Sequence, residues 1–516
     1  MTKQPGIVYL IGAGPGHPGL ITRLGYDILH RADAVVYDDL IPTELIAELL
    51  PDVKRHYVGK RAGKLSLPQA EINDLLVKLA QRGMTVARLK GGDPLIFGRS
   101  GEEMDALSSA GIPTVIIPGV TALTAVAATA GITLTDRRVA SWILLATGRE
   151  ADSPSPVVPW REIAGLSGGT LAVYMGLSTL KRIVGELLAG GMAPQTPVMV
   201  VSKAYNGTQR TVAAPLFKLD SEVQQAGLDS PALVIIGEAI SIRHPPYGGW
   251  QSGALFGKRI MVTRPAGEAA RMCELLRAKG AEPLILPTLC TESYEDLEGW
   301  GKIPNLVGAS GMVVFTSAVG VRHFIAGLLQ HGLDLRILGG FKIAAIGSGT
   351  ADALRRAGLK ADLQSAGGRM AALAKELRRS ADLKGKVLLR VRGDRSDDAI
   401  ERMADEVGAV CLPLTVYRTS PADWDERQKA LLIEKPPDWI TFTSGSTVDS
   451  FVKILGETAA REACRKSKTA SIGPSTTQMA RRLGLEITVE AKVHTVEGLI
   501  KALVAAEATP LPKRPT

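Results

Sequence analysis

A glycine-rich turn near the N-terminus is the first segment whose residues suggest chemistry. The apolar run 7–11 precedes this turn, which spans residues 12–19 and contains four glycines. A strand followed by such a turn is typical of dinucleotide sites, which need the pattern G-x-G-x-x-G and an acid that holds ribose hydroxyls. Asp38 could serve as the acid, but counting from Gly12 places His17 at the third glycine. The pattern therefore argues against NAD.

In the C-terminal half, hydroxyl-rich turns stand where we expect helices to begin. They contain Thr316, Ser317, Ser348, Thr350, Thr443, Ser444, Ser446, Ser475 and Thr476. The free backbone N–H groups of helix N-termini, assisted by hydroxyl groups, bind carboxylates well. These turns could therefore bind a polyanionic ligand, although capping of the helix is the commoner role of any single turn. This half shows no catalytic triad, metal cluster or Walker loop.

Composition and charge narrow the class of partner. The chain has 61 Lys and Arg against 52 Asp and Glu, a net charge of +9, and the arginines are separated rather than gathered in long runs. Separated arginines suit bidentate recognition of carboxylate or phosphate. Aromatic residues make up only 4% of the chain, which removes the stacking platforms that single-stranded nucleic-acid binders need. A polyanionic small molecule is favoured over nucleic acid or a membrane surface.

The elements that must position these residues follow from the hydrophobic pattern. Short apolar runs at 33–38, 85–89 and 113–119 alternate with helical patterns. This alternation predicts parallel sheets covered by helices. The apolar stretch 115–134 is broken by proline and glycine, and it favours a buried helix over a membrane span.

The cysteines and the N-terminus indicate the compartment. Cys273, Cys290, Cys411 and Cys464 are far apart and show no CxxC spacing. They are typical of buried thiols in a reducing compartment. The N-terminus leads directly into an expected strand, so no signal peptide is expected. We expect a cytoplasmic protein without a bound metal.

The length and an internal repeat predict the domain organisation. A chain of 516 residues can form roughly three or four domains. A proline- and glycine-rich segment at 244–257 separates two halves. In the second half the sequence repeats at an offset of about 127 residues, so that 342–363 is echoed by 468–489. The repeat predicts two similar α/β lobes with a cleft between them.

Motifs of the first half resemble those of the tetrapyrrole methyltransferases, in particular uroporphyrinogen-III C-methyltransferase. The resemblance covers about residues 5–243 and rests on "VYLIGAGPGHPGLIT", "VVYDDLI", "VGKRAG", "RLKGGDPLIFGR" and "IPGVTA" in this order. It implies two α/β lobes with S-adenosylmethionine between them. Residue by residue, it implies cofactor contacts from Pro15, Gly91, Gly92, Asp93, Ile96, Thr121, Ala122, Met175 and Ala204.

The same resemblance implies two residues for proton chemistry. An electron-rich porphyrinogen carbon attacks the sulfonium methyl, and the resulting cation must then lose a proton. Asp38 matches the position of a proton acceptor in the family, and Lys60, in "GKRAG", matches that of a proton donor. A strand-end cap and a solvated surface charge are the structural alternatives for these two residues.

The second half, over about residues 257–505, resembles uroporphyrinogen-III synthase. The motifs are "VTRPAG", "VVFTSAVGV", "IAAIGSGTADAL", "VYRT", "TFTSGSTV" and "SIGPSTTQMA". This family closes linear hydroxymethylbilane into uroporphyrinogen III. The resemblance implies that Tyr417 hydrogen-bonds the departing hydroxyl, and a purely structural aromatic at a strand end fits that position equally well. Arg264 is a plausible partner for a substrate carboxylate.

Together these features predict an α/β protein: a two-lobed tetrapyrrole methylase fold followed by a two-lobed, internally duplicated synthase fold. The expected boundaries are 1–245, with lobes near 1–118 and 119–245, a linker at 246–256, the synthase at 257–508 and a flexible tail at 509–516. We expect a bifunctional enzyme that makes precorrin-2 for sirohaem or cobalamin synthesis, and the methylase family implies a homodimer. The alternatives are a methyltransferase of a later corrin precursor and a non-catalytic, ligand-binding C-terminal half.

Overall fold

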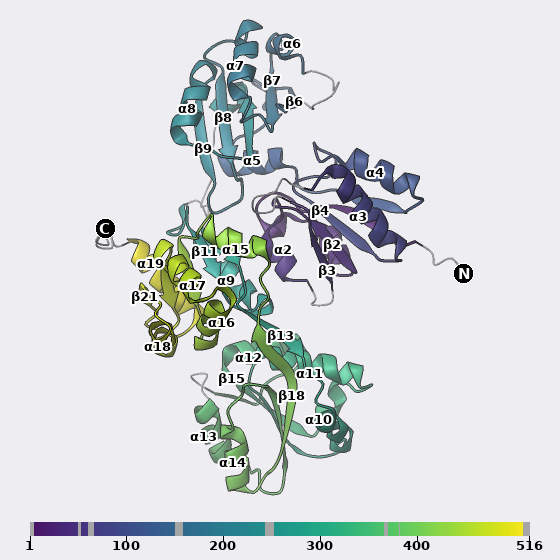
Figure 1. Ribbon diagram of the computed structural model, residues 1–516, viewed down its shortest axis with the longest axis vertical. Coiled ribbons are helices and arrows are strands. Elements are labelled where there is room, and N and C mark those ends of the chain that lie inside the picture. The colour runs from purple at the N-terminus through teal and green to yellow at the C-terminus, as the bar shows by residue number, and fades with distance from the viewer. Residues whose placement is uncertain are drawn as a thin grey trace. The chain divides into compact units, whose positions relative to one another are not determined.

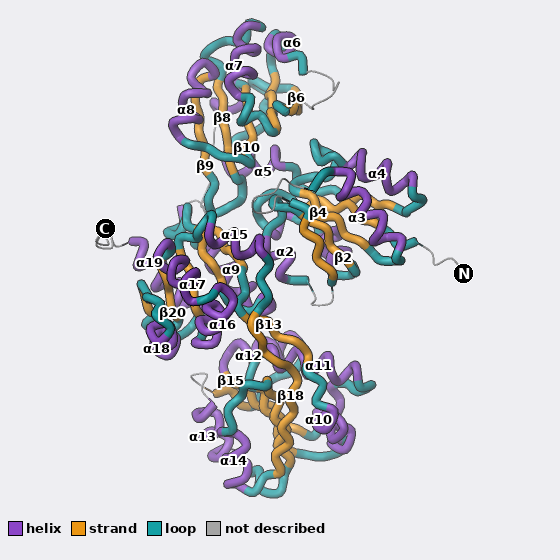
Figure 2. Tube along the Cα trace, in the orientation of Figure 1, coloured by secondary structure: helices purple, strands orange, loops and turns teal. Residues whose placement is uncertain are grey.

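The computed structural model describes residues 5–49, 53–59, 67–149, 158–242, 252–365, 370–380 and 382–508. These residues form four β-sheets, and helices flank the strands of each sheet (Figures 1 and 2). The chain divides into two compact units, one of Met1–Thr288 with Asp423–Thr516 and the other of Leu289–Ala422. The expected α/β class is confirmed.

The first sheet is fully parallel, with the order β3-β2-β4-β1-β5. Its strands are β1 (Val8–Gly12), β2 (Ala34–Tyr37), β3 (Lys54–Tyr57), β4 (Val86–Lys90) and β5 (Thr114–Ile117). The helices around it are α1 (Arg23–Leu29), α2 (Thr43–Ala47), α3 (Gln69–Gln81) and α4 (Ser100–Ser109). The apolar runs at 33–38 and 113–119 contain β2 and β5, and the run at 85–89 overlaps β4, so the prediction of a parallel sheet is confirmed here.

The second sheet is mixed, with the order β6-β7-β10-β8-β9. Its strands are β6 (Trp142–Thr147), β7 (Gly169–Tyr174), β8 (Pro197–Ser202), β9 (Arg210–Pro215) and β10 (Ala232–Ile236). The associated helices are α5 (Ala122–Ala130), α6 (Trp160–Ala164), α7 (Leu180–Ala189) and α8 (Leu219–Ala226). Only β6 and β7 are parallel, whereas β10 runs antiparallel to β7 and β8, and β8 to β9. The expectation of parallel sheets is wrong for this sheet, because β8 and β9 are joined by a short connection without a crossover helix.

The apolar stretch 115–134 contributes to two elements. Its beginning lies in β5 and its middle forms α5, a helix of 9 residues whose Leu123 and Val126 pack against Met199 of β8. Within the described ranges, no helix combines the length and the apolar character that crossing a membrane requires.

The C-terminal half contains the third and fourth sheets. The third sheet is parallel, in the order β12-β11-β19-β20-β21. Its strands are β11 (Arg259–Val262), β12 (Glu282–Ile285), β19 (Trp439–Phe442), β20 (Lys468–Ser471) and β21 (Val489–Glu490). Its helices are α9 (Ala266–Ala278), α15 (Glu426–Ile433), α16 (Gly445–Leu455), α17 (Glu457–Lys466), α18 (Pro474–Arg482) and α19 (Val496–Ala508).

The fourth sheet has the order β13-β18-β17-β14-β15-β16, and only β13 runs antiparallel to its neighbour. Its strands are β13 (Leu289–Ser293), β14 (Gly311–Phe315), β15 (Phe341–Ile346), β16 (Leu363–Ser365), β17 (Val387–Gly393) and β18 (Val410–Pro421). Its helices are α10 (Leu297–Lys302), α11 (Ala318–Gln330), α12 (Gly347–Arg356), α13 (Met370–Ser380) and α14 (Ala399–Val407).

The duplication predicted from the sequence is present, but one copy does not form one lobe. The first copy supplies β11, β12, β14, β15 and β16, and the second supplies β17, β18, β19, β20 and β21. The third sheet joins the first two strands of the first copy to the last three of the second, and the fourth sheet does the reverse. Apart from the additional edge strand β13 of the fourth sheet, both sheets therefore share the same strand order, and each combines parts of both copies.

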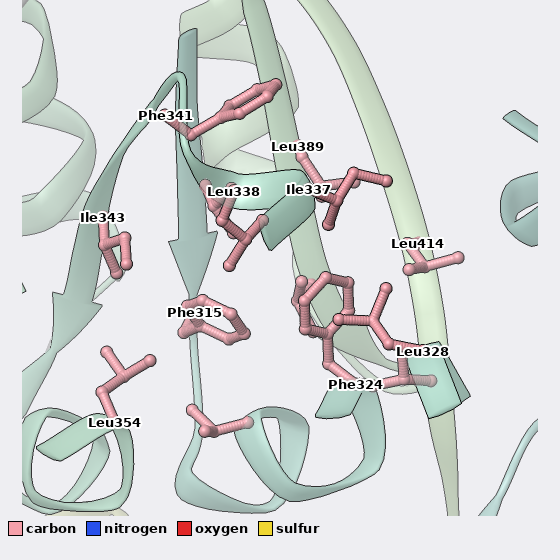
Figure 3. Packing of buried hydrophobic residues seen from close by; sticks show 14 of the residues in the cluster. Phe315, Phe324, Leu328, Ile337, Leu338, Phe341, Ile343, Leu354, Leu389 and Leu414 are labelled. Atoms are coloured by element: carbon pink, nitrogen blue, oxygen red, sulfur yellow. The ribbon is translucent and has the colours of Figure 1, made fainter. Parts of the chain in front are cut away.

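The core of the fourth sheet fixes the helix that carries part of the candidate site. Phe315 of β14 and Phe324 of α11 are fully buried, and their ring centroids lie 5.5 Å apart at 73° (Figure 3). Such edge-to-face pairs contribute about 1 kcal/mol beyond the area that they bury. This packing holds α11 against β14, and its first turn therefore stays at the carboxyl end of that strand.

Candidate functional site

The glycine-rich turn after β1 is held by the loop that follows β4. The N–H of Gly14 donates to the carbonyl of Gly92 at 3.2 Å, and that of Gly92 donates to Gly14 at 3.1 Å. Both glycines have positive φ angles, 69° and 73°, which favour glycine. A Cβ on Gly12 would lie 2.6 Å from the Cα of Gly119, in the loop after β5. These glycines therefore allow three loops to approach closely at the carboxyl ends of parallel strands.

Asp93 connects two of these loops. One carboxylate oxygen accepts from the Leu95 N–H at 2.8 Å, and the other accepts from the Gly119 N–H at 2.9 Å. A carboxylate has about four lone-pair directions, so acceptor capacity remains for a ligand. The backbone bonds hold the Asp93 carboxylate in one orientation at the loop cluster.

Tyr174, the last residue of β7, links α5 to the second sheet. Its hydroxyl lies 2.7 Å from the hydroxyl of Thr121, which is the N-cap of α5, and accepts from the Leu123 N–H at 3.2 Å. Its ring centroid lies 5.0 Å from that of Phe97 in the loop after β4. Burial raises the pKa of Tyr174, which keeps its hydroxyl protonated. No motif in the sequence singles out Tyr174.

Backbone strain marks the same loops. Among the described residues, the non-glycine positions with positive φ are Phe97, Arg99, Met175, Lys203 and Tyr205, with angles of 52° to 57°. Such conformations cluster at functional sites. A Cβ on Gly16 would lie 2.2 Å from the carbonyl oxygen of Ala204, so the turn after β1 also reaches the loop after β8.

The predicted cofactor residues all follow the carboxyl ends of strands in this loop cluster. Pro15 follows β1; Gly91, Gly92, Asp93 and Ile96 follow β4; Thr121 and Ala122 follow β5; Met175 follows β7 and Ala204 follows β8. Met175 is 43% exposed and Ala204 is buried. Segments that lie far apart in the sequence are therefore brought to one place by hydrogen bonds and close backbone contacts between their loops.

Asp38 lies beside this cluster, directly after β2. One oxygen accepts from the Leu40 N–H at 3.1 Å, and the other lies 3.3 Å from Nη2 of Arg88. Leu40 in turn lies against Gly91, where an added Cβ would be 2.6 Å from the Leu40 Cβ. The side chain of Asp38 is 25% exposed, so the carboxylate remains accessible. Lys60, the predicted proton donor, lies outside the described residues.

At the carboxyl edge of the third sheet, Arg264 follows β11 and forms an ion pair with Glu268 at 2.7 Å. Its Nε is buried without a hydrogen-bond partner. After β19, Ser444 caps α16 by accepting from the Thr447 N–H at 3.2 Å, and its hydroxyl lies 2.9 Å from that of Ser446. Arg264 and the Ser444 turn are therefore at the same edge of one parallel sheet.

The remaining predicted residues of the third sheet differ in exposure. Thr443 precedes the Ser444 cap and is half-buried. Ser475 and Thr476 lie in the first turn of α18; Ser475 is exposed, whereas Thr476 is 1% exposed. Of the two, only the Ser475 side chain lies at the surface.

In the fourth sheet, Tyr417 of β18 meets the first turn of α11. Its hydroxyl lies 3.1 Å from that of Ser317, which caps α11 by accepting from the Gly320 N–H at 2.9 Å. Thr316 donates to the carbonyl of Val391 at 3.3 Å. Tyr417 of β18 therefore contacts a hydrogen-bonded turn at the carboxyl end of β14, close to the end of β17.

The turn after β15 lies in the first turn of α12. Ser348 is exposed there, whereas Thr350 is 4% exposed. The hydroxyl-rich turns thus begin α11, α12, α16 and α18, as expected, and in two of them a serine makes the capping bond.

His323 of α11 and Gly393 of β17 complete the surroundings of Tyr417. The His323 ring centroid lies 5.7 Å from that of Tyr417 at 25°, and its Nδ1 lies 3.0 Å from the hydroxyl of Ser293. Burial, with a smaller contribution from Arg322, lowers the pKa of His323, so the ring is neutral near pH 7. A Cβ added to Gly393 would lie 2.5 Å from Cζ of Tyr417, so the ring of Tyr417 lies directly against this glycine.

Sequence reasoning missed these neighbours, together with Arg88 and Glu103 in the first half. Arg88 is the first residue of "RLKGGDPLIFGR", but no local pattern assigns it a role. A charged residue inside a strand that is otherwise apolar was the available signal, because Arg and Glu are rarely buried unless they are paired. For His323 no comparable signal exists, since its partners come from β13 and β18.

Two family models match separate parts of the chain. Residues 7–220 match the Tetrapyrrole (Corrin/Porphyrin) Methylases, and residues 270–501 match Uroporphyrinogen-III synthase HemD. The first match covers the first sheet and all strands of the second except β10, and the second match covers the fourth sheet and all strands of the third except β11.

Individual relatives agree with both matches. The chain is 32% identical over 506 residues to the porphyrin biosynthesis protein HemD of Ruminiclostridium josui, covering 97% of this chain and 98% of that protein. It is 36% identical over 339 residues to uroporphyrinogen-III C-methyltransferase of Bacillus subtilis (strain 168), covering 66% and 69%. The solved structure of uroporphyrin-III C-methyl transferase from Thermus thermophilus, complexed with S-adenyl homocysteine, is 35% identical and covers 46% of this chain and 94% of its own, with a TM-score of 0.40. The chain belongs to the tetrapyrrole methylases through its N-terminal half and to the uroporphyrinogen-III synthases through its C-terminal half.

Proposed function

We propose that this enzyme catalyses two consecutive reactions of tetrapyrrole biosynthesis. The C-terminal half cyclises hydroxymethylbilane to uroporphyrinogen III, and the N-terminal half methylates that product at C2 and C7 to give precorrin-2. The observation that carries the proposal is the gathering of Gly92, Asp93, Thr121 and Met175 in one strained loop cluster. Membership of both families in a single chain supports the pairing of the two reactions.

S-adenosylmethionine is the cofactor of the N-terminal half, and the residues present fit it. Gly92 has no Cβ and leaves space next to the Ala122 N–H, where an added Cβ would approach to 3.6 Å. Asp93 keeps acceptor capacity for hydroxyl or ammonium groups, and Met175 offers an exposed apolar surface. The bound cofactor supplies an electrophilic methyl group on a sulfonium centre.

Asp38 acts as the proton acceptor of the methylation. It stands at the edge of the loop cluster, and Arg88 and the Leu40 N–H orient its carboxylate. A carboxylate held in this way can take the proton that the methylated carbon must lose. Lys60 acts as the proton donor, as the family resemblance implies.

In the C-terminal half, the protein bends the linear substrate and holds its carboxylates. Within the unit that contains the third sheet, the first turns of α16 and α18 offer backbone N–H groups and hydroxyls to carboxylates, and Arg264 adds a guanidinium group. Within the unit of the fourth sheet, the first turns of α11 and α12 offer backbone N–H groups and hydroxyls. The Tyr417 hydroxyl donates a hydrogen bond to the departing hydroxyl of the substrate, with Ser317 holding it in place.

Three further proposals concern the domain boundaries, the oligomeric state and the compartment of the protein. The two activities reside at 1–245 and 257–508, joined by a linker at 246–256 of which residues 246–251 lie outside the described ranges. The methylase half forms the contact of a homodimer. The four free cysteines suit a reducing, cytoplasmic compartment.

One incubation tests the proposal. Purified protein is supplied with hydroxymethylbilane and S-adenosylmethionine, and the products are followed by their absorption spectra and by mass. Formation of precorrin-2 supports both activities, and its absence overturns the proposal. Methylation of added uroporphyrinogen III without cyclisation would identify the C-terminal half as a binding module instead. Methylation of a later corrin precursor alone would favour the second alternative.

A further inference from the structure

A fully buried carboxylate lies beneath the loop that follows β4. Glu103 of α4 is 0% exposed. Its Oε1 accepts from Nε of Arg88 at 3.1 Å, and its Oε2 accepts from Nζ of Lys90 at 2.6 Å. Arg88 and Lys90 are two residues apart on β4, so both side chains lie on the same face of the strand. A single carboxylate thus holds two buried cations.

Arg88 extends this contact to the methyl-transfer site. Its Nη1 and Nη2 lie 3.4 and 3.3 Å from Oδ2 of Asp38, and Nη1 also donates to the Leu89 carbonyl at 2.8 Å. Because the guanidinium is planar, fixing Nε on Glu103 also fixes the direction of the two terminal nitrogens. The orientation of the Asp38 carboxylate therefore depends on Glu103 through Arg88.

Lys90 brings the same carboxylate to the base of the cofactor loop. It directly precedes Gly91, and its Cε would lie 3.2 Å from a Cβ on Gly98 near the other end of the loop. Burial lowers the pKa of Lys90, whereas Glu103 opposes that shift. The negative charge of Glu103 therefore favours the charged form of the buried Lys90 ammonium group.

Stability alone does not explain such a network. Replacing a buried group of ion-paired residues with well-packed apolar residues is often neutral or stabilising, because desolvation of the charges offsets their attraction. The neighbouring Glu102 forms an exposed pair with Arg99 at 2.7 Å. Helix α4 therefore contributes Glu102 to an exposed ion pair and Glu103 to a buried one, which leads to Asp38 through Arg88.

We propose that Glu103 is a positioning residue for the methylation, which it serves by orienting Arg88 and, through Arg88, the carboxylate of Asp38. This inference rests on the proposed function, since it takes Asp38 as the proton acceptor. Glu103 itself lies below the loop and does not contact substrate or cofactor. It aligns a group that must meet the methylated carbon in one geometry.

A double-mutant cycle on kcat of the methylation tests the inference. Glu103→Gln removes the charge and keeps the shape, and it lowers kcat about ten- to a hundred-fold, the range expected when a reacting group is misplaced by a fraction of an ångström. In an Asp38→Asn background, Glu103→Gln has no further effect on kcat, because both changes disable the same group. Equal losses from Glu103→Gln in both backgrounds, or no loss in the wild type, would overturn the proposal.

Two matched variants separate positioning from folding. Glu102→Gln makes the same change one residue away on the exposed face, and it leaves kcat unchanged. Glu103→Asp keeps the charge on a shorter side chain and gives a kcat between those of the wild type and Glu103→Gln. If Glu103→Gln does not fold, the cycle is measured with Glu103→Asp. An Asp38→Asn protein with full kcat would refute the proton-acceptor role instead, and so the two failures are distinguishable.

Discussion

The hydroxyl of Tyr417 on β18 lies 3.1 Å from the hydroxyl of Ser317 at the first turn of α11. This bond joins the one aromatic side chain that the family resemblance singled out to a helix N-terminus that can bind carboxylates. Through it, the proposed leaving-group contact and the proposed carboxylate contact lie at one end of the fourth sheet.

Removing the Tyr417 hydroxyl should slow cyclisation without affecting methylation. Tyr417→Phe keeps the ring, and loss of one hydrogen bond to a departing group lowers kcat by about a hundred-fold. Uroporphyrinogen III formation from hydroxymethylbilane measures the effect, and methylation of added uroporphyrinogen III is the internal control. Tyr294→Phe, the same change at a tyrosine covered by Arg418, should leave both rates unchanged. An unimpaired Tyr417→Phe enzyme would assign Tyr417 a structural role.

Gly393→Ala should displace the Tyr417 ring, because the added Cβ would lie 2.5 Å from Cζ of that ring. We expect cyclisation to fall about as far as in Tyr417→Phe, since both changes remove the hydroxyl from its place. Gly301→Ala is the matched control in α10, where an added Cβ meets no atom within 4 Å. The control should keep full activity and gain about 0.5 to 1 kcal/mol of stability. Full cyclisation by Gly393→Ala would show that the ring position does not matter.

Tyr174→Phe should weaken cofactor binding. The variant leaves the Thr121 hydroxyl and the Leu123 N–H without their partner at the start of α5. Unpaired groups of this kind cost about 1 to 3 kcal/mol, so the KM for S-adenosylmethionine should rise about ten-fold while cyclisation is unchanged. Tyr26→Phe, at a tyrosine that donates to Glu48 at 3.1 Å, is the control. An unaltered KM would separate Tyr174 from the cofactor site.

The stability of the chain should depend on pH through His17. Burial lowers the pKa of His17 to about 4, below its value of 6.5 in an unfolded chain. The unfolded state therefore binds the proton more readily, and this contribution to stability is present above pH 6.5 and lost as the pH falls toward 4. Thermal unfolding of His17→Asn and of the wild type should show the variant gaining relative stability from pH 7.5 to about 4.5. A difference in Tm that does not change with pH would contradict the burial of a neutral ring.

The sequence predicted the parallel first sheet and the duplication, but not how the copies combine. The apolar runs that overlap β2, β4 and β5 can be recognised from neighbouring residues alone, because the hydrophobic pattern of a strand is a local property. Whether β11 pairs with β14 or with β19 depends on two crossings of the chain between lobes, and no local pattern encodes them. The antiparallel β8 and β9 were missed for a similar reason, since strand direction is set by the connection between strands.

The residues of the candidate site also differ in whether a local sequence pattern predicts them. Gly92 and Asp93 were predicted from a motif that covers a loop, whereas Met175 was predicted from the resemblance to the methylase family as a whole. Glu103 and His323 contact partners on other elements, and their own surroundings in the sequence look like ordinary helices. Pairings of this kind appear only once the strands are assembled.

The most direct test of two consecutive activities follows hydroxymethylbilane in the presence of S-adenosylmethionine with two variants in parallel. The account predicts that Asp38→Asn accumulates uroporphyrinogen III with little precorrin-2. It predicts that Tyr417→Phe forms little of either compound from hydroxymethylbilane, yet methylates added uroporphyrinogen III at the wild-type rate. Loss of both activities in either variant, or no precorrin-2 from the wild-type protein, would contradict it.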